Sequence, residues 1–324
     1  MRSIKWGIIG CGKVTEVKSG PGFQKAKNSQ LVAVMRRNGA LAKDYAERHN
    51  VPKWYDNAED LINDPEVDAV YIATPPASHK EYTLKCALAG KPVYVEKPMA
   101  RSFEEAVDMV NACKEMGVPL FVAYYRRRLP RFLKVKELIE SGAIGEVRFV
   151  KVTLYEHVAE EELNPETLPW RVIPEISGAG KFFDLASHTL DALDYILGPI
   201  VDASGHNSNQ AGLYTAEDIV TASFKFASGV QGIGAWCFSA FEYFDQNEII
   251  GSKGKIVFSS FGVEPIKLIT ADGHTDFPID NPVHVQQPLI QTIVDELNGE
   301  GTCPSNAESA IRTSCIMDKI LGRI

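Results

Sequence analysis

A lysine at the end of an apolar run is the first residue in this sequence whose placement suits chemistry. The stretch VYVEKPMA, residues 93–100, reads as a buried strand that ends at Glu96, Lys97 and Pro98. Neighbouring side chains of an extended strand point to opposite faces, so an ion pair between Glu96 and Lys97 does not explain the pattern. A partly desolvated lysine near other charges can transfer protons. An ordinary surface lysine after a strand explains these residues equally well.

A carboxylate and an imidazole form a second candidate group. In SGAGKFFDLASHTLD, Gly178 and Gly180 precede an expected helix. On that helix Asp184 and His188 lie four positions apart, and therefore on one face, where they can act together on a hydroxyl proton. The alternative is a helix start followed by a core histidine. Zinc is not expected, because the seven histidines show no HxxxH or HExxH spacing.

A glycine pair marks a candidate site for a dinucleotide. The first expected strand ends in GCGKV, where Gly10 and Gly12 form a GxG pattern between a strand and a helix. Such a turn lets the backbone and the helix N-terminus approach a pyrophosphate. Thr15 replaces the third glycine of the usual fingerprint, and glycines at strand ends often only form turns. The candidate cofactor-binding residues here are Gly10, Gly12, Lys13 and Val14.

The residues after the second expected strand bear on the choice between NADP and NAD. After LVAVM the chain has Arg36 and Arg37, at the place where an acidic residue would bind the ribose hydroxyls of NAD. Guanidinium groups suit the 2'-phosphate of NADP, so NADP is favoured and NAD is the alternative. Two solvated arginines would give the same pattern.

The turn in YIATPPASH is expected at the same edge of the sheet as VEKP. In an open α/β sheet, ligands bind beyond the carboxyl ends of the strands, so the two turns should border one crevice. Ser78 is the expected N-cap of the following helix. Further candidates for contact with the cofactor are Thr74, Pro75, His79 and Glu96.

The order of apolar and amphipathic segments predicts an α/β protein of two domains. Up to residue 122, the apolar runs IKWGIIG, LVAVM, DAVYIAT, PVYVE and PLFVA alternate with helical stretches such as 79–89 and 103–116. Gly90 and Gly117 are placed as C-terminal caps of those helices. The pattern predicts a doubly wound parallel sheet, covered by helices on both faces, over residues 1–122.

Residues 123–324 predict a separate α+β domain with an open, mainly antiparallel sheet. After the helical segment PRFLKVKELIESG, strand-like runs joined by turns at ASG, GSKG and ADG indicate an antiparallel meander. Helices are expected again at 286–298 and near the end of the chain, where Ser305 and Glu308 fit a capping box. The irregular stretch 157–177 has a length typical of functional or mobile loops.

Composition limits the partners and the compartment. The chain of 324 residues has a formal net charge of -8, which disfavours nucleic acid and anionic membrane surfaces as partners. No apolar run approaches the ~20 residues of a membrane span, and MRSIKWGIIG lacks the apolar segment of a secretion signal. The six cysteines contain no CxxC pair, which is typical of reduced thiols. A cytoplasmic protein is expected.

The chain resembles the glucose-fructose oxidoreductase, inositol dehydrogenase and rhizopine catabolism (Gfo/Idh/MocA) family of NAD(P)-dependent oxidoreductases over essentially all its length. The matching pieces are GIIGCGKV, YIATPPASH, AGKPVYVEKPMA, PWR, the glycine pair before Asp184 and His188, and IIGSKGKIVFS. The resemblance implies a Rossmann domain, a substrate-binding and oligomerisation domain, and an active site between them. It also implies hydride transfer between a nicotinamide and a hydroxyl or carbonyl carbon. Homodimers or homotetramers through the second sheet are implied too. The apolar residues of 236–244 are candidates for that contact, and ordinary sheet core explains them equally well.

The resemblance implies roles for the residues singled out above. Lys97 corresponds to the lysine of the family's EKP motif, which lies near the nicotinamide and the substrate hydroxyl, often before a cis proline. Asp184 and His188 correspond to the family's aspartate and histidine, with His188 as the main acid/base and Asp184 as the group that orients the substrate and the imidazole.

Two further segments match the family. Trp170 and Arg171 correspond to the WR pair that borders the site and are candidates for cofactor contact, with Arg171 also contacting substrate. Tyr125 and Arg126 correspond to the substrate-contacting segment that enters the second domain. Relatives that oxidise aromatic dihydrodiols tend to have tyrosine at the position of His188, so the resemblance favours sugars and polyols.

Three alternatives stay open. The first is a non-catalytic dinucleotide sensor or co-repressor of the same fold, which would not need Lys97, Asp184 and His188 together. The second is an enzyme whose tightly bound nicotinamide is recycled within one turnover. The third is a reductase of imines or tetrapyrroles, which His188 disfavours.

Overall fold

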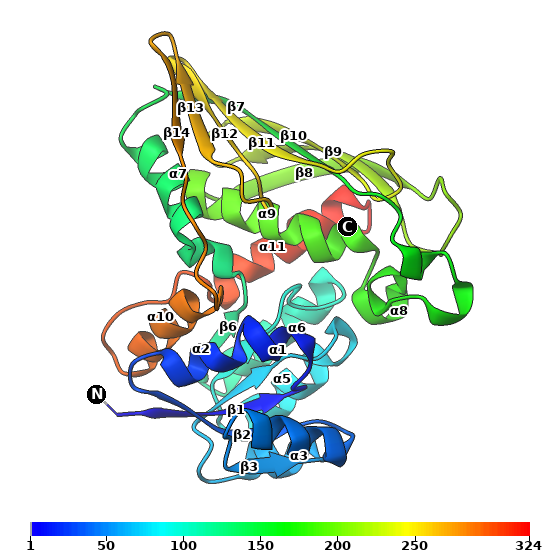
Figure 1. Ribbon diagram of the computed structural model, residues 1–324, viewed down its shortest axis with the longest axis vertical. Coiled ribbons are helices and arrows are strands. Elements are labelled where there is room, and N and C mark those ends of the chain that lie inside the picture. Colours follow the sequence, from blue (N-terminus) through cyan, green and yellow to red (C-terminus); the bar gives the residue numbers. More distant parts are fainter. Residues whose placement is uncertain (1) are drawn as a thin grey trace. The chain divides into compact units, whose positions relative to one another are not determined.

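The computed structural model describes residues 2–324, and the chain divides into two compact units (Figure 1). The first unit comprises Met1–Leu129 and Pro282–Ile311, and the second comprises Pro130–Asn281 and Arg312–Ile324. These units differ from the predicted division after residue 122, because residues 123–129 and 282–311 lie with the first unit. The late segment pairs with the last strand of that unit: Val122 N–H donates to Ser305 O, and Ser305 Oγ donates to Val122 O at 2.7 Å.

The first unit contains a six-stranded sheet in which all strands are parallel. In spatial order the strands are β3 (Lys53–Tyr55), β2 (Ser29–Met35), β1 (Ile4–Ile9), β4 (Ala69–Ile72), β5 (Val93–Val95) and β6 (Leu120–Val122). The predicted Rossmann sheet is confirmed. The sequence pattern misses β3, because its lysine, tryptophan and tyrosine do not form an apolar run.

The first unit contains helices between its strands and one further helix late in the chain. They are α1 (Lys13–Val17), α2 (Gly20–Lys25), α3 (Gly39–Arg48), α4 (Ala58–Asn63), α5 (His79–Leu88), α6 (Phe103–Glu115) and α10 (Gln287–Leu297). The helices predicted at 79–89, 103–116 and 286–298 are therefore confirmed. Gly90 and Gly117 follow α5 and α6 with φ of +69° and +66°, a left-handed conformation that glycine adopts without a steric penalty.

Ser78 stands at the N-cap position of α5, as predicted, but its side chain does not cap the helix. The hydroxyl donates instead to Thr74 Oγ1 at 2.8 Å and to Pro75 O at 3.2 Å. A single-turn 3-10 helix, Pro76–Ser78, precedes α5 and directs the hydroxyl back toward the turn. Ser78 therefore stabilises the turn that follows β4.

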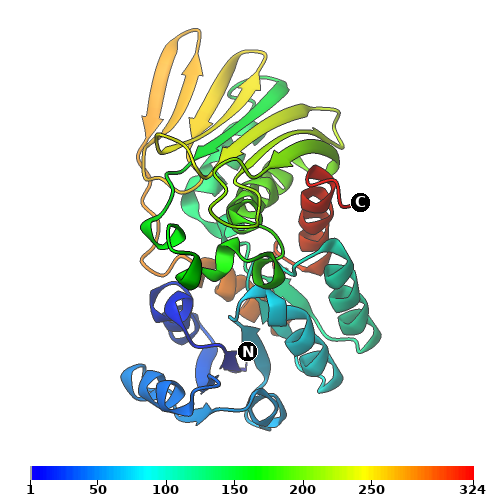
Figure 2. The same ribbon diagram turned by 90° about the vertical axis from the view of Figure 1, so that its right-hand side faces the viewer.

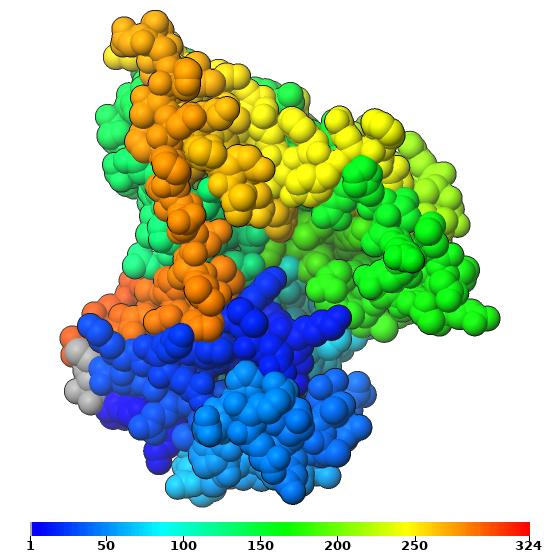
Figure 3. All heavy atoms as spheres, in the orientation of Figure 1, coloured from blue at the N-terminus to red at the C-terminus, as the bar shows by residue number. Residues whose placement is uncertain are grey.

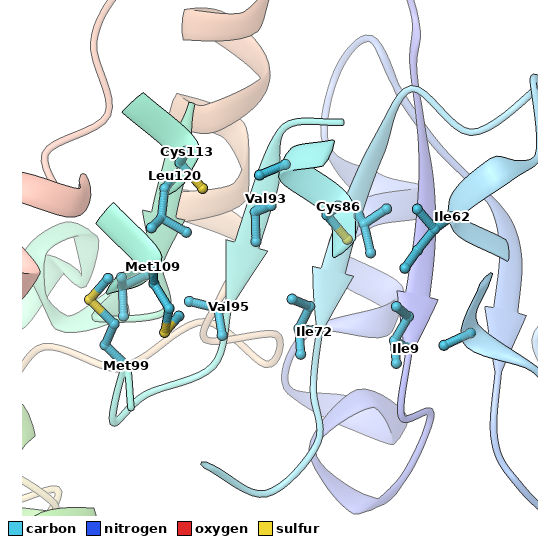
Figure 4. Close-up of a cluster of buried hydrophobic side chains, with 14 of the residues drawn as sticks. Ile9, Ile62, Ile72, Cys86, Val93, Val95, Met99, Met109, Cys113 and Leu120 are labelled. Carbon is cyan, nitrogen blue, oxygen red and sulfur yellow. The ribbon is translucent and has the colours of Figure 1, made fainter. Parts of the chain in front are cut away.

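A buried apolar core lies on one face of the first sheet (Figure 4). Side chains from the strands, such as Ile72, Val93 and Val95, pack with Cys86 of α5 and Met109 of α6. Each fully buried aliphatic side chain contributes roughly 1.5–3 kcal/mol. This packing holds the ends of β4 and β5, which are followed by the candidate site residues.

The second unit contains an eight-stranded sheet (Figure 2). In spatial order the strands are β14 (Gly273–Phe277), β13 (Ile266–Thr270), β12 (Gly254–Phe258), β11 (Phe244–Gly251), β7 (Val147–Tyr155), β10 (Gln231–Cys237), β9 (Ile219–Phe226) and β8 (Ile200–Ser208). All neighbours are antiparallel except β7 and β10. The mainly antiparallel sheet is confirmed, but a simple meander is wrong because β7 lies between β10 and β11.

Helices cover one face of this sheet (Figure 2), and the hairpin of β13 and β14, orange in Figure 3, forms one edge. The helices of the unit are α7 (Pro130–Glu140), α8 (Pro174–Ser177), α9 (Lys181–Leu197) and residues 312–320 of α11 (Ala307–Ile320). α7 confirms the helix predicted from PRFLKVKELIESG. The sequence pattern misses β8, IVDASGHNS, because most of its exposed positions are polar and only Ile200 is buried.

Two details of the remaining segments concern the predictions. The stretch 157–177 contains 3-10 turns at Glu160–Glu162, Pro165–Thr167 and Trp170–Val172, followed by α8, and has no strand. The predicted capping box at α11 is wrong: Asn306 Oδ1 accepts from Ser309 N–H at 3.0 Å, while the hydroxyl of Ser305 donates to Val122 O. Asparagine caps helices as well as serine does, so the cap lies one residue later.

Candidate active site

The glycine turn of the first unit brings the backbone of β1 close to that of β4. Gly10 has φ of +91°, and a Cβ there would lie 2.7 Å from Thr74 Cγ2 and 3.0 Å from Thr74 N, so only glycine fits. The N–H groups of Gly10 and Cys11 both donate to Met35 O. α1 then begins at Lys13, with Gly12 at the N-cap and no side chain bonded to the cap. The first turn of α1 is therefore not occupied by a capping side chain.

Thr15 takes the place of the third glycine without disturbing the turn. Its side chain is fully buried, and Oγ1 donates to Gly12 O at 2.8 Å. Thr15 O accepts from the Tyr45 hydroxyl at 2.8 Å, and α1 ends at Val17. A short helix held by α3 in this way accommodates a threonine where a longer helix would need a glycine for close packing.

Glu16, on α1, forms a charge cluster with the end of α3. Its carboxylate accepts two hydrogen bonds of 2.8 Å from Arg48 and one of 2.7 Å from His49 Nε2. The Arg48 guanidinium carbon lies 5.7 Å from the centre of the Tyr45 ring, in a cation–π contact. The bonds from Arg48 are the largest influence on the pKa of Glu16 and lower it to about 2. The cluster fastens α1 to α3 beside the glycine turn.

We expect this cluster to stabilise the protein only above acidic pH. The folded-state pKa of Glu16 lies below the ordinary value of 4.5, so its contribution is complete above about pH 4.5 and is lost as the pH falls toward 2. Glu16→Gln should remove this part of the acid sensitivity and lower the melting temperature at neutral pH by at most roughly 2–4 °C. Thermal unfolding followed by circular dichroism across this pH range measures the effect. Glu47→Gln, in the exposed pair with Lys43, should follow the wild-type profile.

Arg36 and Arg37 follow β2, and both are exposed. The Arg36 N–H donates to Tyr55 O at 3.2 Å, which fixes the backbone there. Burial raises the pKa of the Cys11 thiol to about 11, and the charge of Arg36 is the largest opposing influence.

His79 lies behind the turns that follow β4 and β5. Its ring is fully buried, Nε2 lies 2.7 Å from Thr74 O, and Nδ1 lies 3.1 Å from Pro98 O and 3.3 Å from Met99 O. Burial lowers the pKa of His79 below its ordinary value. His79, which was predicted to contact the cofactor, therefore links the two turns. Thr74 and Pro75 lie nearer the surface.

Lys97 lies two residues after the end of β5, with Glu96 between them, and the Lys97–Pro98 peptide is cis, as the family resemblance implies. Its backbone N–H donates to Glu96 Oε2 at 3.1 Å. Glu96 is 6% exposed, and its Oε1 accepts from the Tyr71 hydroxyl at 2.5 Å and from Gln286 Nε2 at 2.6 Å. Sequence reasoning missed Gln286, because 190 positions separate it from Glu96.

Tyr125 and Arg126 begin a 3-10 turn after β6 in the first unit. Both are buried, and the Arg126 guanidinium lies 5.3 Å from the centre of the Tyr125 ring. Ala123 N–H donates to Val95 O, so this turn leaves the sheet beside the end of β5. The predicted substrate-contacting pair therefore lies at the same sheet edge as the Lys97 turn.

In the second unit, α9 carries Asp184 and His188 one turn apart, and both are buried. Arg171 Nε donates to Asp184 Oδ2 at 2.7 Å, and its guanidinium lies 4.6 Å from the Trp170 ring centre. The structure thus brings together Trp170, Arg171 and Asp184, three residues predicted for the site. The rings of His188 and Phe261 pack edge to face with centroids 6.1 Å apart.

Lys181 is a further polar residue on the same face of α9, three positions before Asp184. It is 8% exposed, and its amine forms an ion pair of 2.6 Å with the buried Glu162 and one of 3.6 Å with Glu156. Burial raises the pKa of Glu156 above its ordinary value. The helical spacing of Lys181 with Asp184 and His188 is the signal that could have revealed this residue.

Other site types find no support among residues 2–324. No group of three or more histidine, cysteine, aspartate or glutamate side chains in this range is arranged to hold a metal ion. In the same range no helix is both long and apolar enough to cross a membrane. All six cysteines are outside disulfides.

Comparisons with known proteins agree with this arrangement. Residues 4–124 match a family model described as "Oxidoreductase family, NAD-binding Rossmann fold", and residues 132–257 match the "GFO/IDH/MocA C-terminal domain". Oxidoreductase P35 of Formosa agariphila is 41% identical, over 98% of this chain and 98% of its own. The 1,5-anhydro-D-fructose reductase of Ensifer adhaerens is 27% identical, over 95% and 92%. A levoglucosan dehydrogenase in complex with NADH and levoglucosan has the same fold, with a TM-score of 0.86, 24% identity and coverage of 99% and 96%.

Proposed function

Because the chain belongs to the GFO/IDH/MocA family of oxidoreductases, we propose that it is a sugar or polyol dehydrogenase that favours NADP(H). The reaction moves a hydride between the nicotinamide and a hydroxyl or carbonyl carbon of the substrate. The observation that carries the proposal is the turn after β5, where the Lys97 backbone is fixed by Glu96 at the carboxyl edge of a Rossmann sheet.

The residues of the glycine turn fit a dinucleotide. A Cβ at Gly12 would meet nothing nearer than Gly10 O at 3.8 Å, and no side chain bonds to the cap of α1. The backbone is thus accessible to a pyrophosphate on this side, with Lys13 and Val14 in the first turn. When bound, the cofactor would supply the hydride acceptor or donor.

NADP is favoured over NAD by the two arginines after β2. Arg36 and Arg37 are exposed, and they directly follow Met35, whose backbone oxygen accepts from the N–H groups of the glycine turn. Guanidinium groups bind a phosphate through paired, charged hydrogen bonds, which the 2'-hydroxyl of NAD does not match.

Three side chains would handle the proton of the reacting oxygen. Lys97 holds a positive charge for the developing alkoxide and exchanges its proton at Nζ. His188 is the main acid/base on the second unit. Asp184, oriented by the 2.7 Å bond from Arg171, accepts hydrogen bonds from the substrate hydroxyl and the imidazole.

A sugar or polyol substrate is supported by the residues and by the relatives. The amine, carboxylate, imidazole and guanidinium groups among the candidate residues suit molecules with several hydroxyl groups. The relatives named for 1,5-anhydro-D-fructose and levoglucosan act on molecules of this class. Trp170, stacked on Arg171, offers an apolar face to a sugar ring.

We place the association surface on the open face of the second sheet. Lys151, His206, Ile233 and Phe244 help to line a hollow of about 880 Å³ there. Within the predicted stretch 236–244, Phe241 is 96% exposed, whereas Trp236 is fully buried in the core. In a homodimer or homotetramer, a second subunit packed on this face would shield its exposed apolar side chains from water. A cytoplasmic location is part of the proposal.

The test is a panel of aldoses, ketoses, inositols and anhydro sugars with both NAD(H) and NADP(H), followed by absorbance of the reduced nicotinamide. Turnover of a member supports the proposal. Cofactor binding without turnover of any member would favour the sensor. A spectral change on adding sugar to enzyme that retains its nicotinamide through gel filtration would favour internal recycling.

The cofactor preference has its own prediction. Replacing Arg36 and Arg37 together with alanine should raise the KM for NADP(H) by roughly tenfold or more, because a charged phosphate contact is lost. The KM for NAD(H) should stay within about twofold, since NAD lacks that phosphate. Arg148→Ala, at an exposed position of β7, is the control. If the double variant lowers the use of both cofactors equally, the arginines do not select NADP.

A further inference from the structure

Gln286 is fully buried at the start of α10 and is held at both ends of its amide. Nε2 donates to Glu96 Oε1 at 2.6 Å, and Oε1 accepts from the Tyr94 hydroxyl at 2.8 Å. Its backbone N–H donates to Lys18 O at 3.1 Å. Because donor and acceptor are both used, only one orientation of the amide satisfies the network.

Glu96 connects this amide to Lys97. One carboxylate oxygen accepts from Gln286 and Tyr71, while the other accepts the Lys97 backbone N–H. β5 ends at Val95, and the last bond to β4 is made by Glu96 N–H to Ile72 O. Lys97 thus lies one residue beyond the sheet pairing, where the Glu96 carboxylate holds its peptide group instead.

We propose that Gln286 is a positioning residue for Lys97: by orienting the Glu96 carboxylate, it fixes the turn from which the amine reaches the substrate. This inference rests on the proposed function, in which Lys97 handles the proton. In the absence of Gln286, the Tyr71 hydroxyl and the Lys97 N–H still donate to Glu96, but the orientation of the carboxylate is less tightly fixed. A buried anion that has lost a donor recruits another or shifts, and the Lys97 peptide group shifts with it.

Few other groups near Glu96 titrate at working pH. Burial raises the pKa of Tyr71 and of Tyr94 far above the ordinary value, so both remain hydroxyl donors. Burial lowers the pKa of His79, which lies near Glu96 on the other side. The remaining titratable groups that act on Tyr94 are Cys303 and Tyr125. A new carboxyl group at position 286 would therefore stand out in a pH profile.

Gln286→Glu is the informative variant because its carboxyl has the shape of the amide. While protonated, it can donate to Glu96 and accept from Tyr94, so kcat should be close to wild type at low pH. When it ionises, two carboxylates face each other at the present 2.6 Å, and kcat should fall by about tenfold or more. Gln286→Met should lose about tenfold at every pH, because it has no donor. If Gln286 only supported folding, Gln286→Glu would not add a new fall of kcat with rising pH.

Gln291→Met is the matched control, because Gln291 also lies on α10 and its amide bonds to Lys27, away from Glu96. A second readout does not need substrate. The lysines are labelled with 13C-methyl groups, and the Lys97 signal is identified by its loss in Lys97→Arg. The pH midpoint of that signal should shift in both Gln286 variants and stay unchanged in Gln291→Met. If both Gln286 variants keep the wild-type pH profile and Lys97 titration, the inference is wrong. If the wild type turns over no substrate, the proposed function fails, and the Lys97 titration still decides the role of Gln286.

Discussion

Lys97→Met is expected to lower kcat by about 100-fold or more, equivalent to about 2.7 kcal/mol in activation free energy. Methionine keeps the length and apolar stem of lysine but neither carries the charge nor exchanges a proton. The peptide group stays fixed, because the bond from its N–H to Glu96 is made by the backbone. The dissociation constant for NADPH, measured by nicotinamide fluorescence, should therefore stay within about threefold of wild type.

The control for this variant is Lys43→Met, on the exposed surface of α3, which should leave both quantities unchanged. Lys97→Arg tests the charge separately from the proton. Arginine keeps the positive charge but does not release its proton, so its kcat should also be strongly reduced. If Lys97→Met turns over at the wild-type rate, the proton path proposed here is wrong. If only the cofactor affinity falls, Lys97 is a binding residue.

The elements and motifs could be predicted from the sequence because their causes are local. The apolar runs of β1, β2, β4, β5 and β6 identified the first sheet, and the cis Lys97–Pro98 bond matched the EKP motif. The short β3 and the polar β8 were missed because neither contains the apolar run from which a buried strand is predicted. The local pattern likewise predicted the wrong N-cap for α11, because the Ser305 hydroxyl donates to the backbone oxygen of Val122, which is distant in the sequence.

The partners of the candidate residues could not be predicted, because they come from distant segments. Glu96 was identified next to Lys97 in the sequence. Its hydrogen-bond donor Gln286 follows most of the residues of the second unit, far along the chain. Asp184 and Arg171 were each identified by their motifs, yet nothing in the sequence paired them. Motifs identify residues suited to chemistry, whereas tertiary contacts determine which direction those side chains take.

The ion pair of Lys181 and Glu162 leads to the largest expected effect on stability. Their side chains are 9% and 1% exposed, and the amine lies in the first turn of α9, where a helix disfavours positive charge. Glu162→Gln leaves this buried ammonium with Glu156 at 3.6 Å. The free energy of unfolding of the second unit should fall by about 3 kcal/mol, as is typical when one member of a buried ion pair is removed. Urea denaturation followed by tryptophan fluorescence measures this change.

A matched control separates burial from charge. Glu146→Gln breaks an ion pair of 2.8 Å with Arg148 that is exposed on both sides, and should change the free energy of unfolding by less than about 0.5 kcal/mol. Combining Glu162→Gln with Lys181→Met should recover about half of the loss or more, because the unpaired buried charge is gone. Because Glu162 also anchors the stretch 157–177, from which Arg171 reaches Asp184, Glu162→Gln should raise the substrate KM more than it lowers kcat. Equal losses of stability in Glu162→Gln and Glu146→Gln would mean that the buried pair has no special role in holding this segment on α9.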